Sequence, residues 1–177
     1  MSKGFTNLGN TCYMNSALQC LCHLEELSYK NDNFTLDCTK KSPRNDYNLM
    51  SELMKLQKEI WKDNKEGVVS TRNILIEFIK RCQKEKLYFE SFNQNDCQDF
   101  LNKLIDLLHG SIKRKVNIVI KGEPKTNYDN LKIKGINEWK SFFESNYSYI
   151  IKTFYSQLLS ITSCPECDYI TTNHEPI

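Results

Sequence analysis

Four segments in the first 110 residues place apolar side chains every three or four positions, the spacing that lines them along one face of an α-helix. The first segment follows Asn10 and Thr11, either of which can cap a helix. The others lie near residues 50–61, 70–82 and 95–109, and Gly110 is expected to end the last of them. The polar stretch 31–44 is expected to be a loop. The N-terminal part of the chain is therefore predicted to be helical.

The pattern changes after residue 112. Residues 116–120 are predicted to form a short strand, residues 121–135 a polar excursion, and the aromatic residues from Trp139 to Tyr147 a further helix. Residues 157–162 and 169–172 then have the composition of two strands, joined by residues 163–168. Helices are therefore expected first and strands last.

Charge and composition exclude several classes of protein. The chain has 24 Lys and Arg against 22 Asp and Glu, and this near balance argues against a dedicated nucleic-acid-binding protein. No run approaches the roughly 20 apolar residues that cross a bilayer, and residues 1–7 lack the apolar stretch of a secretory signal. We expect a cytoplasmic or nuclear protein that binds no membrane. Its eight cysteines are accordingly expected to be thiols.

Cys12 falls in the first turn of the first predicted helix. A thiol in this position meets unsatisfied backbone N–H groups and the positive end of the helix dipole, which favour the nucleophilic thiolate. Gly9 permits a tight approach of the chain before the helix, and Asn7 offers amide N–H donors for an oxyanion beside the sulfur. These arguments alone leave open that Cys12 is a small core residue.

Residues 4–16, GFTNLGNTCYMNS, resemble the cysteine box of the ubiquitin-specific proteases, which are papain-like cysteine peptidases that cleave the bond after the C-terminal glycine of ubiquitin. The resemblance implies that Cys12 is the nucleophile and Asn7 the oxyanion donor of a deubiquitinase that requires no cofactor. It also implies a papain-like α+β fold: a helical thumb over about residues 1–112, a polar insertion at 113–136, and a helix and the first finger strands at 137–177. The palm is then incomplete.

A second motif, QNDCQDFL at residues 94–101, is by itself only an amphipathic helix with acidic residues at its N-terminal end. It resembles the family's second box, a Gln-Asp-x-x-Glu-Phe pattern on the helix that faces the ubiquitin tail. The resemblance implies that Asp96 and Asp99 bind substrate. Asp99 stands where the family has Glu, and Asn95 where the family often has Gln.

A third motif, CPEC at residues 164–167, lies between the two predicted strands. Cys164 and Cys167 are half of a tetrahedral thiolate site, because a structural zinc ion takes four ligands. The motif resembles the first knuckle of the family's fingers. Zinc is expected here only if further ligands are supplied, since His174 is too isolated to complete the site.

A cysteine peptidase also needs a base, and none of the three histidines, His23, His109 and His174, has the Gly-His-aromatic context of the family's catalytic box. We expect the chain to stop before the catalytic His. It is then a truncated enzyme, a half-enzyme that needs a second chain, or an inactive remnant that binds ubiquitin. A zinc or nucleic-acid module built on Cys164, Cys167 and the lysine-rich segment 113–134 is the remaining alternative.

Overall fold

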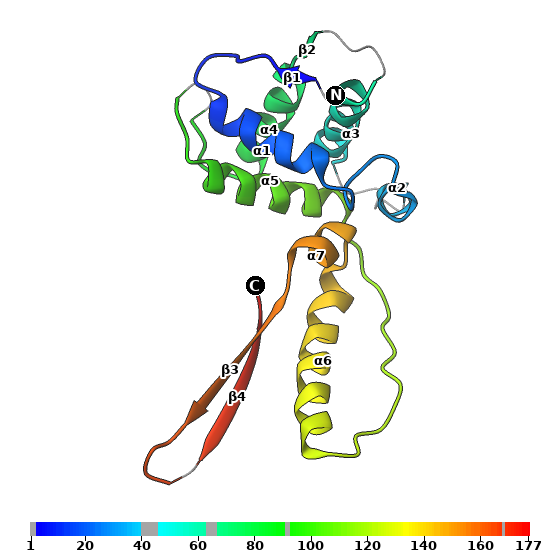
Figure 1. Ribbon diagram of the computed structural model, residues 1–177, viewed down its shortest axis with the longest axis vertical. Helices are drawn as coiled ribbons and strands as arrows, with labels where there is room; N and C mark the ends of the chain where they lie inside the picture. The colour runs from blue at the N-terminus through cyan, green and yellow to red at the C-terminus, as the bar shows by residue number, and fades with distance from the viewer. Residues whose placement is uncertain (1–2, 40–45, 63–66, 91–92, 168) are drawn as a thin grey trace. The chain divides into compact units, whose positions relative to one another are not determined.

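The computed structural model describes residues 3–39, 46–62, 67–90, 93–167 and 169–177, and the chain forms two compact units, 1–113 and 114–177 (Figure 1). Among the described residues, no helix is long and apolar enough to span a membrane. The described residues of the first unit form five helices and two short parallel strands: β1 (Gly4–Phe5), α1 (Cys12–His23), α2 (Asp32–Thr39), α3 (Asn48–Ile60), β2 (Val68–Val69), α4 (Arg72–Lys84) and α5 (Cys97–Ile112).

The core of the first unit lies between α1, α3, α4 and α5, the four helices that the apolar spacing predicts. Phe78 of α4 and Phe100 of α5 are buried with their ring centroids 4.8 Å apart, and the ring of Tyr13 meets Phe100 edge-on at 5.6 Å. Burial of such rings is the main driving force for helix packing. This aromatic contact brings the start of α1 against the start of α5.

Two predictions for the first unit are wrong. The stretch expected to be a loop contains α2, because the Asn31 side chain accepts hydrogen bonds from the N–H groups of Asn33 and Phe34 and so caps a helix that buries Phe34 and Cys38 on one face. Gly110 lies inside α5, which continues to Ile112. Its backbone has no positive φ, so it does not terminate the helix there.

The second unit consists of α6 (Asn127–Asn146), α7 (Tyr149–Phe154) and an antiparallel hairpin of β3 (Gln157–Ser163) and β4 (Ile170–Pro176), in which Leu159 pairs with His174. The two predicted strands are confirmed, and β4 is longer than expected. Residues 116–120 form no strand. The helix predicted around Trp139 begins earlier, because Thr126 and Asp129 form a reciprocal capping box within the expected polar excursion.

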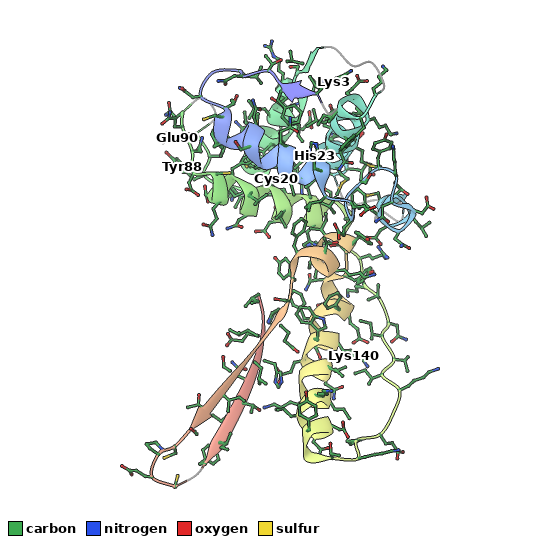
Figure 2. All side chains as sticks on the ribbon, viewed as in Figure 1. Lys3, Cys20, His23, Tyr88, Glu90 and Lys140 are labelled. Atoms are coloured by element: carbon green, nitrogen blue, oxygen red, sulfur yellow. The ribbon has the colours of Figure 1, made fainter. Side chains whose placement is uncertain are left out.

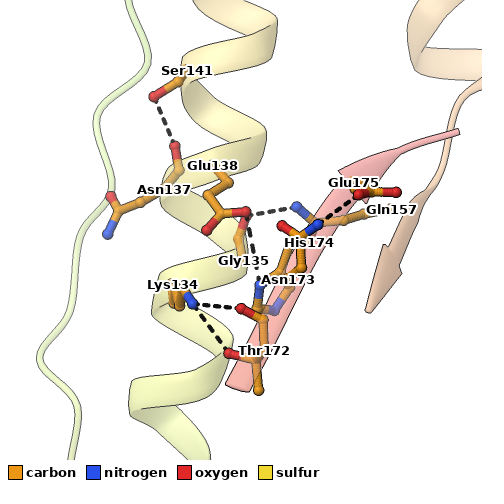
Figure 3. A network of polar contacts seen from close by, with 10 residues as sticks. All are labelled: Lys134, Gly135, Asn137, Glu138, Ser141, Gln157, Thr172, Asn173, His174 and Glu175. Carbon is orange, nitrogen blue, oxygen red and sulfur yellow. Dashed lines mark hydrogen bonds and ion pairs between the residues drawn. The ribbon is translucent and has the colours of Figure 1, made fainter. Parts of the chain in front are cut away.

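A polar network joins the hairpin to α6 at Gly135 (Figure 3). Gln157 of β3 donates to the Gly135 carbonyl oxygen at 2.9 Å, and Lys134 donates to the Thr172 carbonyl oxygen of β4 at 2.7 Å. His174 packs so closely on Gly135 that a Cβ atom there would lie 2.7 Å from its ring. The absence of a side chain at Gly135 therefore sets the approach of the hairpin to the helix.

Candidate active site

Hydrogen bonds hold the segment before Cys12 against α1 and against the pair of strands β1 and β2. The N–H of Thr6 donates to the Val69 carbonyl oxygen at 3.0 Å, which continues the pairing of β1 with β2. From α1, Asn15 donates its amide to the Thr6 carbonyl oxygen at 3.2 Å and accepts from the Thr71 hydroxyl at 3.2 Å. Gln19, one turn further, donates to the Lys3 carbonyl oxygen at 3.1 Å. Side chains of the cysteine box itself thus hold its backbone in place.

The turn that leads into α1 depends on two residues in the left-handed region, Gly9 with φ 93° and Asn10 with φ 52°. Glycine and asparagine are the residues that adopt this conformation at least cost. The turn closes on the Asn7 side chain, whose Oδ1 accepts from the Gly9 N–H at 3.1 Å and from the Thr11 hydroxyl at 3.0 Å. The Nδ2 group of Asn7 makes no hydrogen bond with any described residue, so it is available as a donor.

Cys12 is the first residue of α1 and is exposed. Thr11 precedes it at the N-cap, but the Thr11 hydroxyl is donated to Asn7 and does not cap the helix. The first-turn N–H groups of α1 therefore stay open toward an anion beside Cys12. Cys12 is thus an exposed thiol at a helix start without a side-chain cap, and the turn before it closes on Asn7. The roles of Cys12 as nucleophile and of Asn7 as oxyanion donor stay predictions.

The second motif lies directly beside the first. The Asn95 amide donates to the Tyr13 hydroxyl at 3.1 Å, and the Cys97 Sγ lies 3.4 Å from the Tyr13 carbonyl oxygen. Asp96 caps α5 by accepting from the Asp99 N–H at 2.8 Å, while Asp99 forms an ion pair with Lys103. Both carboxylates are exposed. The structure therefore brings Cys12, Asp96 and Asp99 to one end of the first unit.

Sequence reasoning missed how the two motifs are joined. Asn95 stands where the family often has Gln, and its amide donates to the hydroxyl of Tyr13, the residue after the candidate nucleophile. Cys97, the first residue of α5, is exposed, and its Sγ contacts the Tyr13 carbonyl oxygen. A separation of more than 80 residues hides both contacts from any local pattern.

Neither histidine of the first unit lies beside Cys12. His23 is the last residue of α1 (Figure 2), about 16 Å along the axis from Cys12. Its Nδ1 lies 2.7 Å from the Gln19 carbonyl oxygen. His109 is twelve residues into α5 from the end that contacts Tyr13, or about 18 Å. Burial, and then the Lys113 charge, lower the pKa of His109 to about 4.

The cysteine knuckle lies in the turn after β3. Backbone N–H groups of Glu166 and Cys167, together with the Cys167 thiol, lower the pKa of Cys164 and so favour the thiolate that a metal ion would bind. His174 pairs with Leu159, four residues before the last residue of β3, about 13 Å from that turn. Among the described residues no three His, Cys, Asp or Glu side chains gather as a metal site. The knuckle therefore offers two ligands.

The helices of the first unit and the hairpin of the second give a partial papain-like α+β fold. The family model described as ubiquitin carboxyl-terminal hydrolase matches residues 3–175, and the chain belongs to this family. It is 36% identical to ubiquitin carboxyl-terminal hydrolase 2 of Bos taurus over 98% of this chain and 28% of that protein. With ubiquitin carboxyl-terminal hydrolase 4 of Saccharomyces cerevisiae it shares 26% identity, over 98% of this chain and 20% of the other.

Solved structures show the same fold. A chain of the SAGA DUB module bound to monoubiquitin superposes with a TM-score of 0.64 at 21% identity, over 100% of this chain and 34% of that one. A second structure of the SAGA DUB module gives a TM-score of 0.58 at 22% identity, over 100% of this chain and 35% of that one. The chain thus spans about a third or less of the proteins it matches.

Proposed function

We propose that this chain carries the nucleophile half of a deubiquitinase site and that Cys12 attacks the carbonyl carbon at the C-terminal glycine of ubiquitin. The observation that carries the proposal is the exposed Cys12 at a helix start without a side-chain cap, preceded by a turn that closes on Asn7 Oδ1 and leaves the Nδ2 group free. Family membership supplies the substrate class.

In the proposed reaction the Cys12 sulfur bonds to the ubiquitin carbonyl carbon, and the carbonyl oxygen takes up negative charge. Asn7 Nδ2 and the open N–H groups of α1 donate to that oxygen. The amine then leaves with a proton, and water hydrolyses the thioester. Because neither His23 nor His109 reaches Cys12, and His174 lacks the Gly-His-aromatic context of the family's catalytic box, we propose that a histidine outside these 177 residues moves the protons, from the same polypeptide or from a second chain.

The test is covalent labelling by ubiquitin that carries an electrophile at its C-terminus. Labelling is expected for wild type and lost for Cys12→Ser, with Cys20→Ser as the matched control because Cys20 is also exposed on α1. Equal labelling of wild type and Cys12→Ser would remove Cys12 from the reaction. Absence of labelling from a folded wild type would favour the alternative below.

The lack of a histidine beside Cys12 in the first unit favours one alternative, a module that binds ubiquitin without cleaving it. Asp96→Asn removes the carboxylate charge but keeps the start of α5, because asparagine also caps a helix. Weaker binding of ubiquitin by Asp96→Asn, with no effect of Cys12→Ala and no labelling, would establish the binding module. Unchanged binding by Asp96→Asn would remove the proposed role of Asp96.

We also propose that Cys164 and Cys167 form one half of a zinc knuckle, supported by the N–H groups that lower the pKa of Cys164. Cobalt(II) reports on the pair, because thiolate ligation gives a charge-transfer absorption band. In excess cobalt(II), with water in the remaining coordination positions, the band is expected for wild type and Cys20→Ser and lost for Cys164→Ser. Its absence from the wild-type chain would contradict the proposal.

A further inference from the structure

Cys97 occupies an unusual place for a thiol. It is the first residue of α5 and is exposed, and its Sγ lies 3.4 Å from the carbonyl oxygen of Tyr13, the residue bonded to Cys12. The Asn95 amide donates to the hydroxyl of the same residue, Tyr13. Two helices that pack against each other therefore begin with exposed thiols at neighbouring points of the backbone.

The other cysteines of the first unit differ from this pair. Burial raises the pKa of Cys22 to about 12 and those of Cys38 and Cys82 to about 11, which keeps these thiols protonated and inert. Cys20 is exposed but lies eight residues along α1 from Cys12, about 12 Å away. Cys97 is thus the accessible thiol of this unit whose contacts reach the backbone at Cys12.

We propose that Cys97 is a resolving thiol for Cys12, so that a peroxide converts the pair to a reversible intramolecular disulfide. The Cys12 thiolate attacks one oxygen of hydrogen peroxide, which forms a sulfenic acid and releases hydroxide, and that hydroxide takes up the thiol proton as water. The Cys97 sulfur then attacks the Cys12 sulfur, the S–S bond forms, and the sulfenic oxygen leaves with the Cys97 proton as a second water. Two thiols are oxidised and one peroxide is reduced.

The proposed bond requires the two sulfurs to meet. A disulfide needs Cα atoms about 4.4–6.8 Å apart. Residues 96–99 are all exposed, and the buried part of the helix begins at Phe100. Any displacement that the bond requires would therefore fall on exposed residues, ahead of the buried part of the helix. A dithiol reductant restores both thiols, whereas an unresolved sulfenic acid is oxidised further to an irreversible sulfinic acid.

The consequence of this bond for catalysis rests on the proposed function, but its formation does not. The experiment treats the full chain with hydrogen peroxide, blocks remaining thiols and maps peptides by mass without reduction. A peptide pair joined through Cys12 and Cys97, two hydrogens lighter than the reduced pair, is expected. In Cys97→Ser, whose hydroxyl can still donate to the Tyr13 carbonyl oxygen, Cys12 should instead accumulate as sulfinic acid.

Cys20→Ser is the matched control and should form the same disulfide as wild type. Sulfinic acid at Cys12 that forms equally fast in wild type and in Cys97→Ser would overturn the proposal, and so would a link from Cys12 to any other cysteine. Labelling by the ubiquitin electrophile is measured in parallel and should be lost after peroxide and regained after reduction. Labelling that survives peroxide would contradict the proposed disulfide. A disulfide in a chain that never labels would contradict the proposed function and leave the disulfide standing.

Discussion

Asn7 has two polar atoms with different tasks. Its Oδ1 closes the turn by accepting from Gly9 and Thr11, and its Nδ2 is free for the oxyanion of the proposed reaction. A substitution that changes one atom and keeps the other can therefore separate a role in folding from a role in chemistry.

Asn7→Asp keeps an acceptor for the turn but replaces the donor by a second carboxylate oxygen. With the proposed outside histidine supplied, we expect the rate of hydrolysis of a ubiquitin C-terminal amide to fall by about 10²–10³, the effect of losing one oxyanion donor, with little change in melting temperature. Asn7→Ala loses the turn as well and should also destabilise the fold by about 1–3 kcal/mol. Full activity of a folded Asn7→Asp variant would exclude the oxyanion role.

His109 makes stability depend on pH. Because its folded pKa is lowered from 6.5 to about 4, the unfolded chain gains a proton there as the pH falls below 6.5, while the folded chain does not. Stability is therefore full above pH 6.5 and falls toward pH 4. We expect a loss of about 1 kcal/mol at pH 5, after a discount for the solvent-exposed part of the ring.

His109→Gln should remove that loss. Urea unfolding of both proteins at pH 7 and pH 5 measures it as a difference between the two pH dependences. The same pH dependence in both proteins would show that the proton is taken up elsewhere.

The contact of α6 with the hairpin is decided by one missing side chain. In Gly135→Ala the new Cβ would lie 2.7 Å from His174 Cδ2 and 3.0 Å from Gln157 Oε1, so the hairpin must shift. Overpacking of this kind costs about 1–3 kcal/mol, against which alanine gains up to about 1 kcal/mol in helix propensity. We expect faster amide hydrogen exchange in β3 and β4.

Asn137→Ala is the control for that experiment, because Asn137 is exposed on the same helix and alanine there gains the same kind of propensity. Exchange in β3 and β4 should be unchanged in this variant. If Gly135→Ala also left that exchange unchanged, the close approach at Gly135 would not determine how the hairpin docks.

The two units differ in how much apolar surface each buries. Most of the buried apolar side chains belong to residues 1–113, where four helices share one core. The hairpin of the second unit instead leaves Leu158, Ile161 and Ile170 exposed. A unit with its own core can fold alone, whereas a two-stranded hairpin beside one helix is marginal.

We therefore expect a chain of residues 1–113 to unfold cooperatively in urea and to give a dispersed amide NMR spectrum. Residues 114–177 alone should give neither. A non-cooperative transition for residues 1–113 would contradict this expectation and show that its core needs the second unit.

Local pattern was sufficient for the four core helices and the two hairpin strands, because apolar periodicity reports directly on which face of an element is buried. It failed at α2 and at the start of α6, where side-chain caps at Asn31 and Thr126 turn polar sequence into helix. It also failed at residues 116–120, where an apolar run finds no partner strand among the described residues.

The amino-acid order by itself determined that a thiol would stand at the start of a helix with Asn7 before it, since both lie within one short segment. Tertiary structure alone decided that Asn95 and Cys97 would meet Tyr13, that His109 would lie far from Cys12, and that His174 would pack on Gly135. The physical reason is that these positions depend on residues far apart along the chain, or on the length of a helix in space. Burial of the core brings such residues together, and that burial is a property of the folded chain.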